Sequence, residues 1–351
     1  MNHVSMKPFK NENYPCPVSV IMPVFNTEKY VSDAISSILN QTFFDFEFII
    51  INDGSTDNSM AIIQSFTDDR MTVVQNEKNI GNYPSRNRGI GMAKGKYIAV
   101  MDSDDIALPD RLWKQHDYME NNPSTLATGT QFEFLGNDGN NFKVNRPVSY
   151  HAICAGLLDN NYIVHPSLFI RSEAVKQLGG YDEQYTYSSD YDLVCRLSLI
   201  GKIENLKDKC LRYRWHPGQI SQSKSLAQKE FADKIRQNYQ IKFINRFKSP
   251  ALPEVGEAET AHPVMGRVIG LYIMGQCFNR AFHEMANKLL DFLLNNIHES
   301  IPLTVKNDLP AIGSGLIYLL RNHFVERDEN LPTQQRIKKT IAQLLEMPPK
   351  K

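Results

Sequence analysis

Apolar runs and amphipathic segments alternate through the first 122 residues, and this alternation limits the possible folds more than any other feature of the chain. Strands are expected at 18–25, 46–53, 71–76 and 96–102, and the first of these has the near-continuous apolar character of a parallel strand covered on both faces. Helical patterns lie between and after them, at 26–41, 55–66, 83–95 and 109–119. Alternating strands and helices with short links predict a doubly wound α/β fold with a mixed, mostly parallel sheet.

Beyond residue 122 the pattern is less regular. Strands are expected in mixed order at 123–134 and 165–175, and a buried helix is expected at 190–201. Helical patterns resume later, at 227–247, 266–297 and 336–345. We therefore expect one α/β domain at residues 1–225, divided near residue 122, and a helical C-terminal extension at 226–351.

The overall charge excludes some classes of function. Lys and Arg together number 39, as do Asp and Glu, so nothing in the net charge suggests a nucleic-acid partner. The five cysteines contain no Cys-x-x-Cys pair of the kind that zinc and redox sites use. The N-terminus lacks the apolar stretch of a signal peptide, and no run approaches the roughly 18 apolar residues that cross a bilayer. We expect a cytoplasmic protein whose charge-driven function is local.

Acidic residues gather at the carboxyl ends of two expected strands, in "NDGSTD" (52–57) and "DSDD" (102–105). Ligands bind beyond these strand ends in doubly wound sheets. One Asp would suit a solvated turn or a helix N-cap, but three after a buried strand favour a divalent cation. Asp102 and Asp104 alternate along an extended backbone, so we expect them to share one face.

Gly54 gives the other cluster a tight turn that leaves the Asp53 carboxylate at the strand tip. An ionised carboxylate only accepts hydrogen bonds, so it suits an imide N–H or ribose hydroxyls. The alternative is the Asp-Gly turn of a hairpin, although a helical pattern follows rather than a strand.

Five motifs in order resemble those of the family 2 nucleotide-sugar glycosyltransferases, over roughly residues 16–222: "VSVIMPVFN", "FEFIIINDGSTD", "RNRGIGMAKGKYIAVMDSDD", "GGYDE" and "YRWHPGQIS". The resemblance implies a glycosyltransferase A-type fold, with a nucleotide-binding half at 16–122 and an acceptor half at 123–225. It also implies inverting transfer of GlcNAc, Gal, GalNAc or Glc from a UDP-sugar, assisted by Mn²⁺ or Mg²⁺. The acceptor would be a glycan or lipid-linked saccharide of the bacterial surface.

The resemblance assigns the donor nucleotide to residues of the first half. Asp53 would bind the base, and Asp102 would lie near the ribose. Pro23, Phe25 and Arg86 would flank the nucleotide.

Metal and diphosphate roles follow from the same resemblance. Asp104 would hold the metal ion, and His216 would approach the ion and the diphosphate together with Arg214. The alternative for His216 is a surface histidine beside a Pro-Gly turn.

Inverting transfer needs a base that deprotonates the acceptor hydroxyl. Family members have Glu-Asp where this chain has Ser189 and Asp190, and the resemblance gives Asp190 this role. Asp192 is the rival. Helix positions two apart face different ways, and Asp192 suits an ion pair with Arg196 at i+4, so we favour Asp190.

His165, Gly180 and Tyr181 are matched to the acceptor side of the cleft, although the two glycines of "GGYDE" suit a simple turn equally. Two other functions remain open. One is an inactive nucleotide- or glycan-binding module, and the other is a sugar nucleotidyltransferase, for which "MPVFNTEKY" lacks a phosphate-cradling glycine loop. The basic, amphipathic segment 336–345 suits either packing on 266–297 or peripheral contact with the inner membrane.

Overall fold

The computed structural model describes residues 14–135 and 142–247, with four helical pairs at 268–269, 271–272, 286–287 and 289–290. Contacts divide the chain into two compact units. The first comprises Met1–Ile153 with Asn161–Phe231, and the second comprises Cys154–Asn160 with Ala232–Lys351. The predicted segment 336–345 and most of 266–297 lie outside the described residues. Within the described residues, no helix combines the length and hydropathy of a membrane span.

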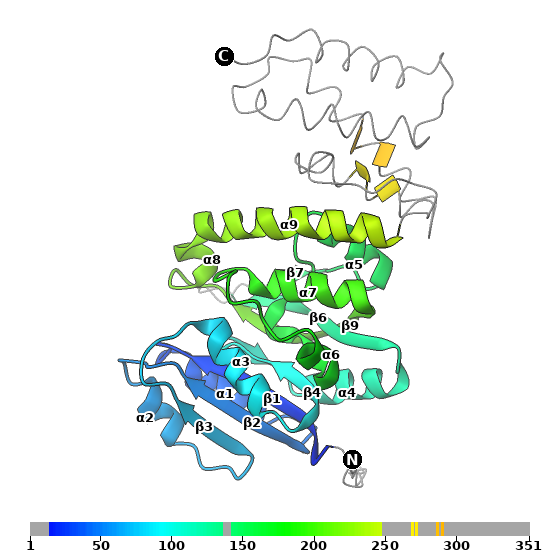
Figure 1. Cartoon of the computed structure of the whole chain (residues 1–351). Coiled ribbons are helices and arrows are strands. Elements are labelled where there is room, and N and C mark those ends of the chain that lie inside the picture. Colours follow the sequence, from blue (N-terminus) through cyan, green and yellow to red (C-terminus); the bar gives the residue numbers. More distant parts are fainter. Residues whose placement is uncertain are drawn as a thin grey trace, which may run out of the picture. The chain divides into compact units, whose positions relative to one another are not determined.

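The first unit is built on a mixed nine-stranded sheet of order β3-β2-β1-β4-β8-β6-β9-β5, with β7 paired to β6 (Figure 1). This mixed α/β architecture confirms the predicted fold class. The strands are β1 (Cys16–Val24), β2 (Phe46–Asn52), β3 (Met71–Gln75), β4 (Gly95–Val100), β5 (Ile106–Ala107), β6 (Thr125–Leu135), β7 (Phe142–Val144), β8 (Phe169–Arg171) and β9 (Lys202–Arg214).

The named helices are α1 (Val31–Leu39), α2 (Ser59–Gln64), α3 (Asn82–Met92), α4 (Arg111–Asn121), α5 (Tyr150–Leu157), α6 (Ser172–Gln177), α7 (Ser189–Ile200), α8 (Ile220–Ser223) and α9 (Ser225–Phe247). Most of α9 belongs to the second unit, whereas α1 and α3 pack on opposite faces of the sheet. Strand side chains alternate between faces, so Val20 packs in the core that includes α1, while Ile21 faces α3. A Cβ on Gly89 of α3 would lie only 2.6 Å from the Ile21 side chain. The missing Cβ therefore lets α3 approach the sheet closely.

Strand direction brings β9 to the edge of the sheet where β4 ends. β8 is antiparallel to both β4 and β6, and β6 is parallel to β9. Two reversals restore the direction of β4, so the carboxyl ends of β1, β2, β4 and β9 lie at one edge. The residues after β9 therefore meet the acidic turn after β4.

Two expectations from the sequence were wrong here, and one strand was missed. Segment 165–175 is not one strand, because a 3₁₀ turn at His165–Ser167 precedes β8 and α6 begins at Ser172. β9 was not predicted, because charged residues interrupt its apolar pattern. Residues 102–105 form a turn rather than an extended segment, with Asp105 N donating to Asp102 O at 3.4 Å.

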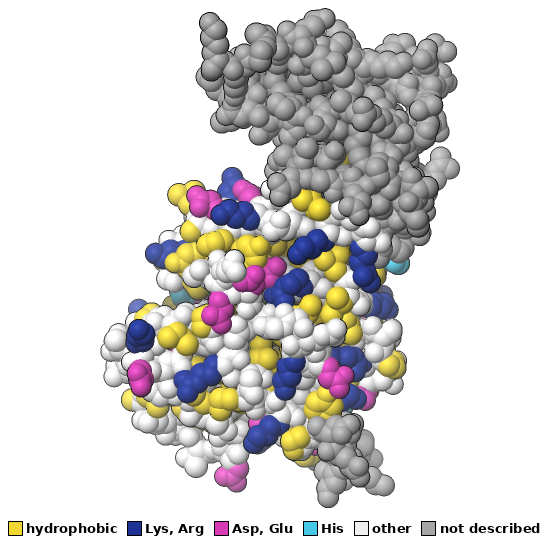
Figure 2. Space-filling view, in the orientation of Figure 1, with side chains coloured by type: hydrophobic (Ala, Val, Ile, Leu, Met, Phe, Trp, Pro, Cys, Tyr) yellow, Lys and Arg dark blue, Asp and Glu magenta, His cyan; other side chains and the backbone are white. Residues whose placement is uncertain are grey.

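The surface of the described residues mixes both signs of charge. On the face shown in Figure 2, basic and acidic side chains are interspersed with apolar and neutral ones. This distribution agrees with the equal numbers of basic and acidic residues. No single sign of charge dominates this face, so a strong local field requires a cluster of like charges elsewhere in the described residues.

Candidate active site

Three carboxylates meet in the turn after β4. One ligand oxygen from each of Asp102, Asp104 and Asp105 lies within 4.8 Å of the others. Asp105 is 1% exposed, and its Oδ1 accepts a hydrogen bond from Arg214 N at 2.8 Å. Its Oδ2 has no hydrogen-bond partner among the described residues. A buried carboxylate oxygen without a donor is unfavourable, so this turn is suited to a cation.

The electrostatics of the turn support the same conclusion. Burial raises the pKa of Asp105 well above its ordinary value, and the charges of Asp104 and Asp102 raise it further. Burial also raises the pKa of Asp102, to about 6, although the Arg86 guanidinium opposes this effect. A divalent cation would relieve this repulsion, and a set of oxygen donors suits Mg²⁺ or Mn²⁺. The residues present fit the metal that the resemblance implies.

His216 approaches the acidic turn from the end of β9. Its Nε2 lies 3.0 Å from Asp104 Oδ2, and its ring centroid lies 4.6 Å from that of Tyr30. Arg214 donates from Nε to Asp104 O at 2.9 Å, and its guanidinium lies 4.9 Å from the centroid of the Tyr30 ring. Arg214 also pairs with Asp33 at 3.0 Å. The structure therefore brings Asp104, Arg214 and His216 together and adds Tyr30, which sequence reasoning missed.

Arg86 holds Asp102 in place from α3. The guanidinium is almost fully buried, pairs through Nη2 with Asp102 Oδ1, and donates from Nη1 to Met101 O at 3.3 Å. Of the other residues expected to flank a nucleotide, Pro23 is buried within β1 and Phe25 is 42% exposed directly after it. Contact of these three side chains with a nucleotide stays a prediction.

Asp53 lies at the end of β2, but its carboxylate already has several partners. Oδ1 accepts from Asn76 Nδ2 at 2.7 Å and from Ile80 N at 3.0 Å, and Oδ2 accepts from Gly81 N at 2.9 Å. A carboxylate has about four acceptor sites, so one remains for a base. In the structure, Asp53 therefore fixes the segment that leads into α3, and its contact with a base stays a prediction.

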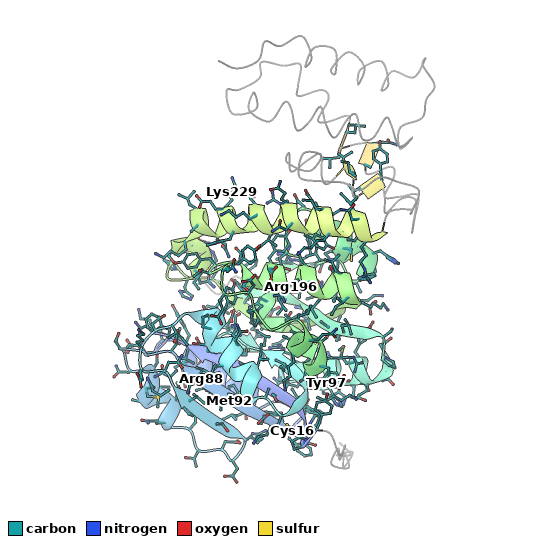
Figure 3. The ribbon with its side chains drawn as sticks, viewed as in Figure 1. Cys16, Arg88, Met92, Tyr97, Arg196 and Lys229 are labelled. Carbon is teal, nitrogen blue, oxygen red and sulfur yellow. The ribbon has the colours of Figure 1, made fainter. Side chains whose placement is uncertain are left out.

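Asp190 lies in the first turn of α7. Its Oδ1 accepts from the Tyr83 hydroxyl at 2.9 Å, and its Oδ2 accepts from Asn161 Nδ2 at 3.2 Å. Burial raises the pKa of Asp190 above its ordinary value, while these two hydrogen bonds act in the opposite direction. The rival Asp192 pairs with Arg196 of the same helix at 2.7 Å, the i+4 ion pair that the sequence indicated. Arg196 is labelled on α7 in Figure 3.

The residues expected on the acceptor side lie next to Asp190. Tyr181 stacks on Tyr83 with a ring-centroid distance of 5.3 Å, and its hydroxyl lies 2.8 Å from His165 Nε2. Burial lowers the pKa of His165 well below its ordinary value, with the charges of Arg86 and Arg111 adding to the effect. His165 is therefore a neutral imidazole at physiological pH.

One helix connects the acidic turn with Asp190. Tyr83 and Arg86 are three residues apart on α3, a spacing that places both side chains on one side of a helix. Tyr83 binds Asp190, and Arg86 binds Asp102. Sequence reasoning missed Tyr83, although the expected helix at 83–95 carried this spacing. It also missed Asn161, for which the sequence holds no signal.

Glycine is required at position 180 for two separable reasons. Gly179 and Gly180 have φ of 76° and 77°, but only at Gly180 would an added Cβ meet a neighbour, Asn87 Oδ1 at 2.4 Å. Gly179→Ala is expected to cost about 1–2 kcal/mol of unfolding free energy through backbone strain. Gly180→Ala is expected to cost more, because it adds the clash. Urea denaturation of both variants tests this, and equal losses would show that Asn87 simply moves aside.

Comparisons with known proteins relate the chain to enzymes. The sequence profile described as "Glycosyl transferase family 2" matches residues 19–179. An uncharacterized glycosyltransferase of Haemophilus influenzae is 31% identical, with 72% of this chain and 85% of the relative covered. The O-antigen biosynthesis glycosyltransferase WbnJ of Escherichia coli is 34% identical, covering 66% and 92%. The structure of S. aureus TarS 1-349 in complex with UDP-GlcNAc shares the fold, with a TM-score of 0.58 at 17% identity over 93% of this chain and 90% of that one.

Proposed function

Because the chain belongs to glycosyltransferase family 2, we propose that it transfers a sugar from a UDP-sugar to a hydroxyl of a saccharide acceptor with inversion at the anomeric carbon. The observation that carries the proposal is that α3 contacts both the acidic turn, through Arg86, and Asp190, through Tyr83. The acidic turn with His216 suits a metal and a diphosphate, and the half-buried Asp190 suits a base. Both functions are required for this reaction.

The relatives support a class of sugar and acceptor. WbnJ is named for O-antigen biosynthesis, and a Bacillus subtilis relative is named as a putative teichuronic acid biosynthesis enzyme. TarS has been solved with UDP-GlcNAc. We therefore propose GlcNAc, Gal, GalNAc or Glc as the transferred sugar and a glycan or lipid-linked saccharide of the bacterial surface as acceptor. A lipid-linked acceptor would bring the enzyme to the cytoplasmic face of the inner membrane, where segment 336–345 is the candidate contact.

Donor binding is assigned to the carboxyl edge of the sheet. Asp104 and His216 would hold Mn²⁺ or Mg²⁺, with Asp102 and Asp105 completing the acidic surroundings. When bound, the metal supplies Lewis-acid stabilisation of the departing diphosphate. Phe25 offers an exposed aromatic ring at the end of β1, and Asp53 has one acceptor site left for a base N–H.

Transfer is proposed to occur in one displacement with Asp190 as the base. The ionised carboxylate takes the proton of the acceptor hydroxyl as that oxygen bonds to the anomeric carbon. The bond from the anomeric carbon to the diphosphate oxygen breaks at the same time, and its electron pair leaves with UDP. Because the pKa of Asp190 is raised, this step is expected to slow as the pH falls through that value.

A thermal-shift comparison of UDP, GDP, CMP and dTDP with Mn²⁺ tests the donor class. A ligand at 100 times its Kd stabilises the folded state by about 2.7 kcal/mol, so UDP is expected to raise the Tm by several degrees. The same nucleotides without a divalent ion are the control and are expected to shift the Tm less. Release of UDP from UDP-sugars with a saccharide acceptor then separates an enzyme from an inactive binding module. No shift with any nucleotide would refute the proposed donor site.

A further inference from the structure

Asp190 is held by two side chains that come from different parts of the chain. The Tyr83 hydroxyl binds Oδ1 from α3, and Asn161 Nδ2 binds Oδ2 from the segment after α5. Each oxygen of the carboxylate thus has one side-chain donor. Backbone hydrogen bonds at Tyr191 and Asp190 also favour the charged form of this carboxylate.

Tyr83 is fixed as a donor. The residue is 6% exposed, its ring stacks on Tyr181 at an interplanar angle of 25°, and it meets the His165 ring edge-on at 6.4 Å. Burial raises the pKa of Tyr83 well above its ordinary value, and the Asp190 charge adds to the effect. The hydroxyl therefore keeps its proton across the pH range in which an enzyme of this kind works.

Asn161 is also fixed in one orientation. Its Oδ1 accepts a hydrogen bond from Ile163 N at 3.1 Å, so the opposite end of the amide, Nδ2, is turned to Asp190. An amide is assigned from such a network, and here the backbone donor defines which end is which. Both donors to Asp190 are thus preorganised by contacts of their own.

We infer that Tyr83 and Asn161 are positioning residues of the transfer reaction: each holds one oxygen of the Asp190 carboxylate and so fixes the orientation in which the carboxylate meets the acceptor hydroxyl. The inference rests on the proposed role of Asp190 as the base. Helix α3 then positions two carboxylates, because Tyr83 holds Asp190 and Arg86 holds Asp102. A base fixed in this way needs no reorientation when the acceptor binds.

Loss of either donor has a defined consequence for Asp190. Both hydrogen bonds favour the ionised carboxylate, so their removal raises the pKa of Asp190 further. Among the described residues, titratable groups that interact electrostatically with this carboxylate include Tyr181, from the loop after α6, and Asp102, from the turn after β4. Tyr83→Phe leaves both of them in place and keeps the stacked ring.

The test is the pH profile of kcat/KM for Tyr83→Phe together with a direct titration of Asp190. We expect the acid limb to move up by about one pH unit, with the KM for the donor unchanged. Carboxyl NMR of ¹³C-Asp-labelled protein, assigned with Asp190→Asn, is expected to show the same upward shift. Asn161→Ala provides an independent variant and is expected to shift both readouts in the same direction.

Tyr118→Phe is the matched control, because Tyr118 also donates to a carboxylate, that of Glu204 at 2.7 Å, away from Asp190. It is expected to leave the pH profile unchanged. Unchanged titration of Asp190 in both Tyr83→Phe and Asn161→Ala would overturn the inference, even if the wild type transfers sugar. If the NMR titration shifts but the wild type transfers no sugar from any nucleotide donor, the contacts are supported and the proposed function fails.

Discussion

Replacement of Asp190 by Asn is expected to lower kcat for sugar transfer by about 10²–10⁴-fold, because an amide cannot take the proton of the acceptor hydroxyl. The substitution keeps the size of the side chain and its acceptor oxygen for Tyr83 or Asn161. Affinity for UDP is expected to stay within a few-fold of wild type, since Asp190 is proposed to act on the acceptor rather than on the nucleotide. Single-turnover transfer and calorimetric binding of UDP measure the two quantities separately.

Asp192→Asn is the control on the same helix. Asp192 pairs with Arg196, which also donates to Leu178 O and Gly180 O, so this change weakens the support of the loop that carries Gly180. A lower Tm with kcat within a few-fold of wild type is expected. If Asp192→Asn abolished transfer while Asp190→Asn retained it, the assignment of the base would have to be reversed.

The fold could be predicted where the pattern was local and apolar. The strands predicted at 18–25, 46–53 and 96–102 are buried on both faces, and their sequences show it directly, whereas β3 is a partly exposed edge strand. β9 could not be found in this way, because a strand that ends at the edge of a site carries charges such as Lys209 and Arg212, which pair with Glu133 of β6. Its apolar signal is replaced by cross-strand ion pairs that only the tertiary structure reveals.

The candidate site was predicted unevenly for a related reason. Asp104 and His216 are 112 residues apart, and the resemblance suggested them together although nothing local connects them. The sequence assigned no separate role to Asp105, and its burial beneath the backbone of Arg214 depends on β9, which was not predicted. The sequence shows which residue types follow each strand. Which of these residues contact one another depends on the order and direction of the strands in the sheet, and this pattern was not predicted.

The three carboxylates of the acidic turn lie close enough together to destabilise the folded protein. Asp102, Asp104 and Asp105 repel one another, and Arg86 pairs with only one of them. Such a cluster lowers the stability of the folded state unless a cation binds. Removal of one of these charges should therefore raise the stability of the metal-free protein and lower its activity, if the acidic turn binds a metal.

Asp104→Asn is expected to separate these two effects. Without added metal its Tm should equal or exceed that of wild type, because the Asp104 charge raises the pKa of both Asp102 and Asp105 and its removal relieves that repulsion. Changes beyond the direct ligands of a metal already cost about 10–100-fold in affinity, so loss of a ligand is expected to weaken Mn²⁺ binding by at least about 100-fold. Electron paramagnetic resonance of free Mn²⁺ in the presence of UDP measures this affinity, and sugar transfer should fall in parallel.

Asp208→Asn is the matched control, because Asp208 is exposed and pairs with Lys114 at 2.9 Å on the surface. An exposed pair of this kind contributes about 0–1 kcal/mol, so Mn²⁺ affinity and transfer are expected to match wild type. Treatment of wild-type protein with a chelator is expected to reproduce the Asp104→Asn defect, and added Mn²⁺ should restore wild type but not the variant. Transfer that survives both chelation and Asp104→Asn would mean that the acidic turn serves the donor by hydrogen bonding rather than through a metal, since its carboxylates would then have no cation to hold.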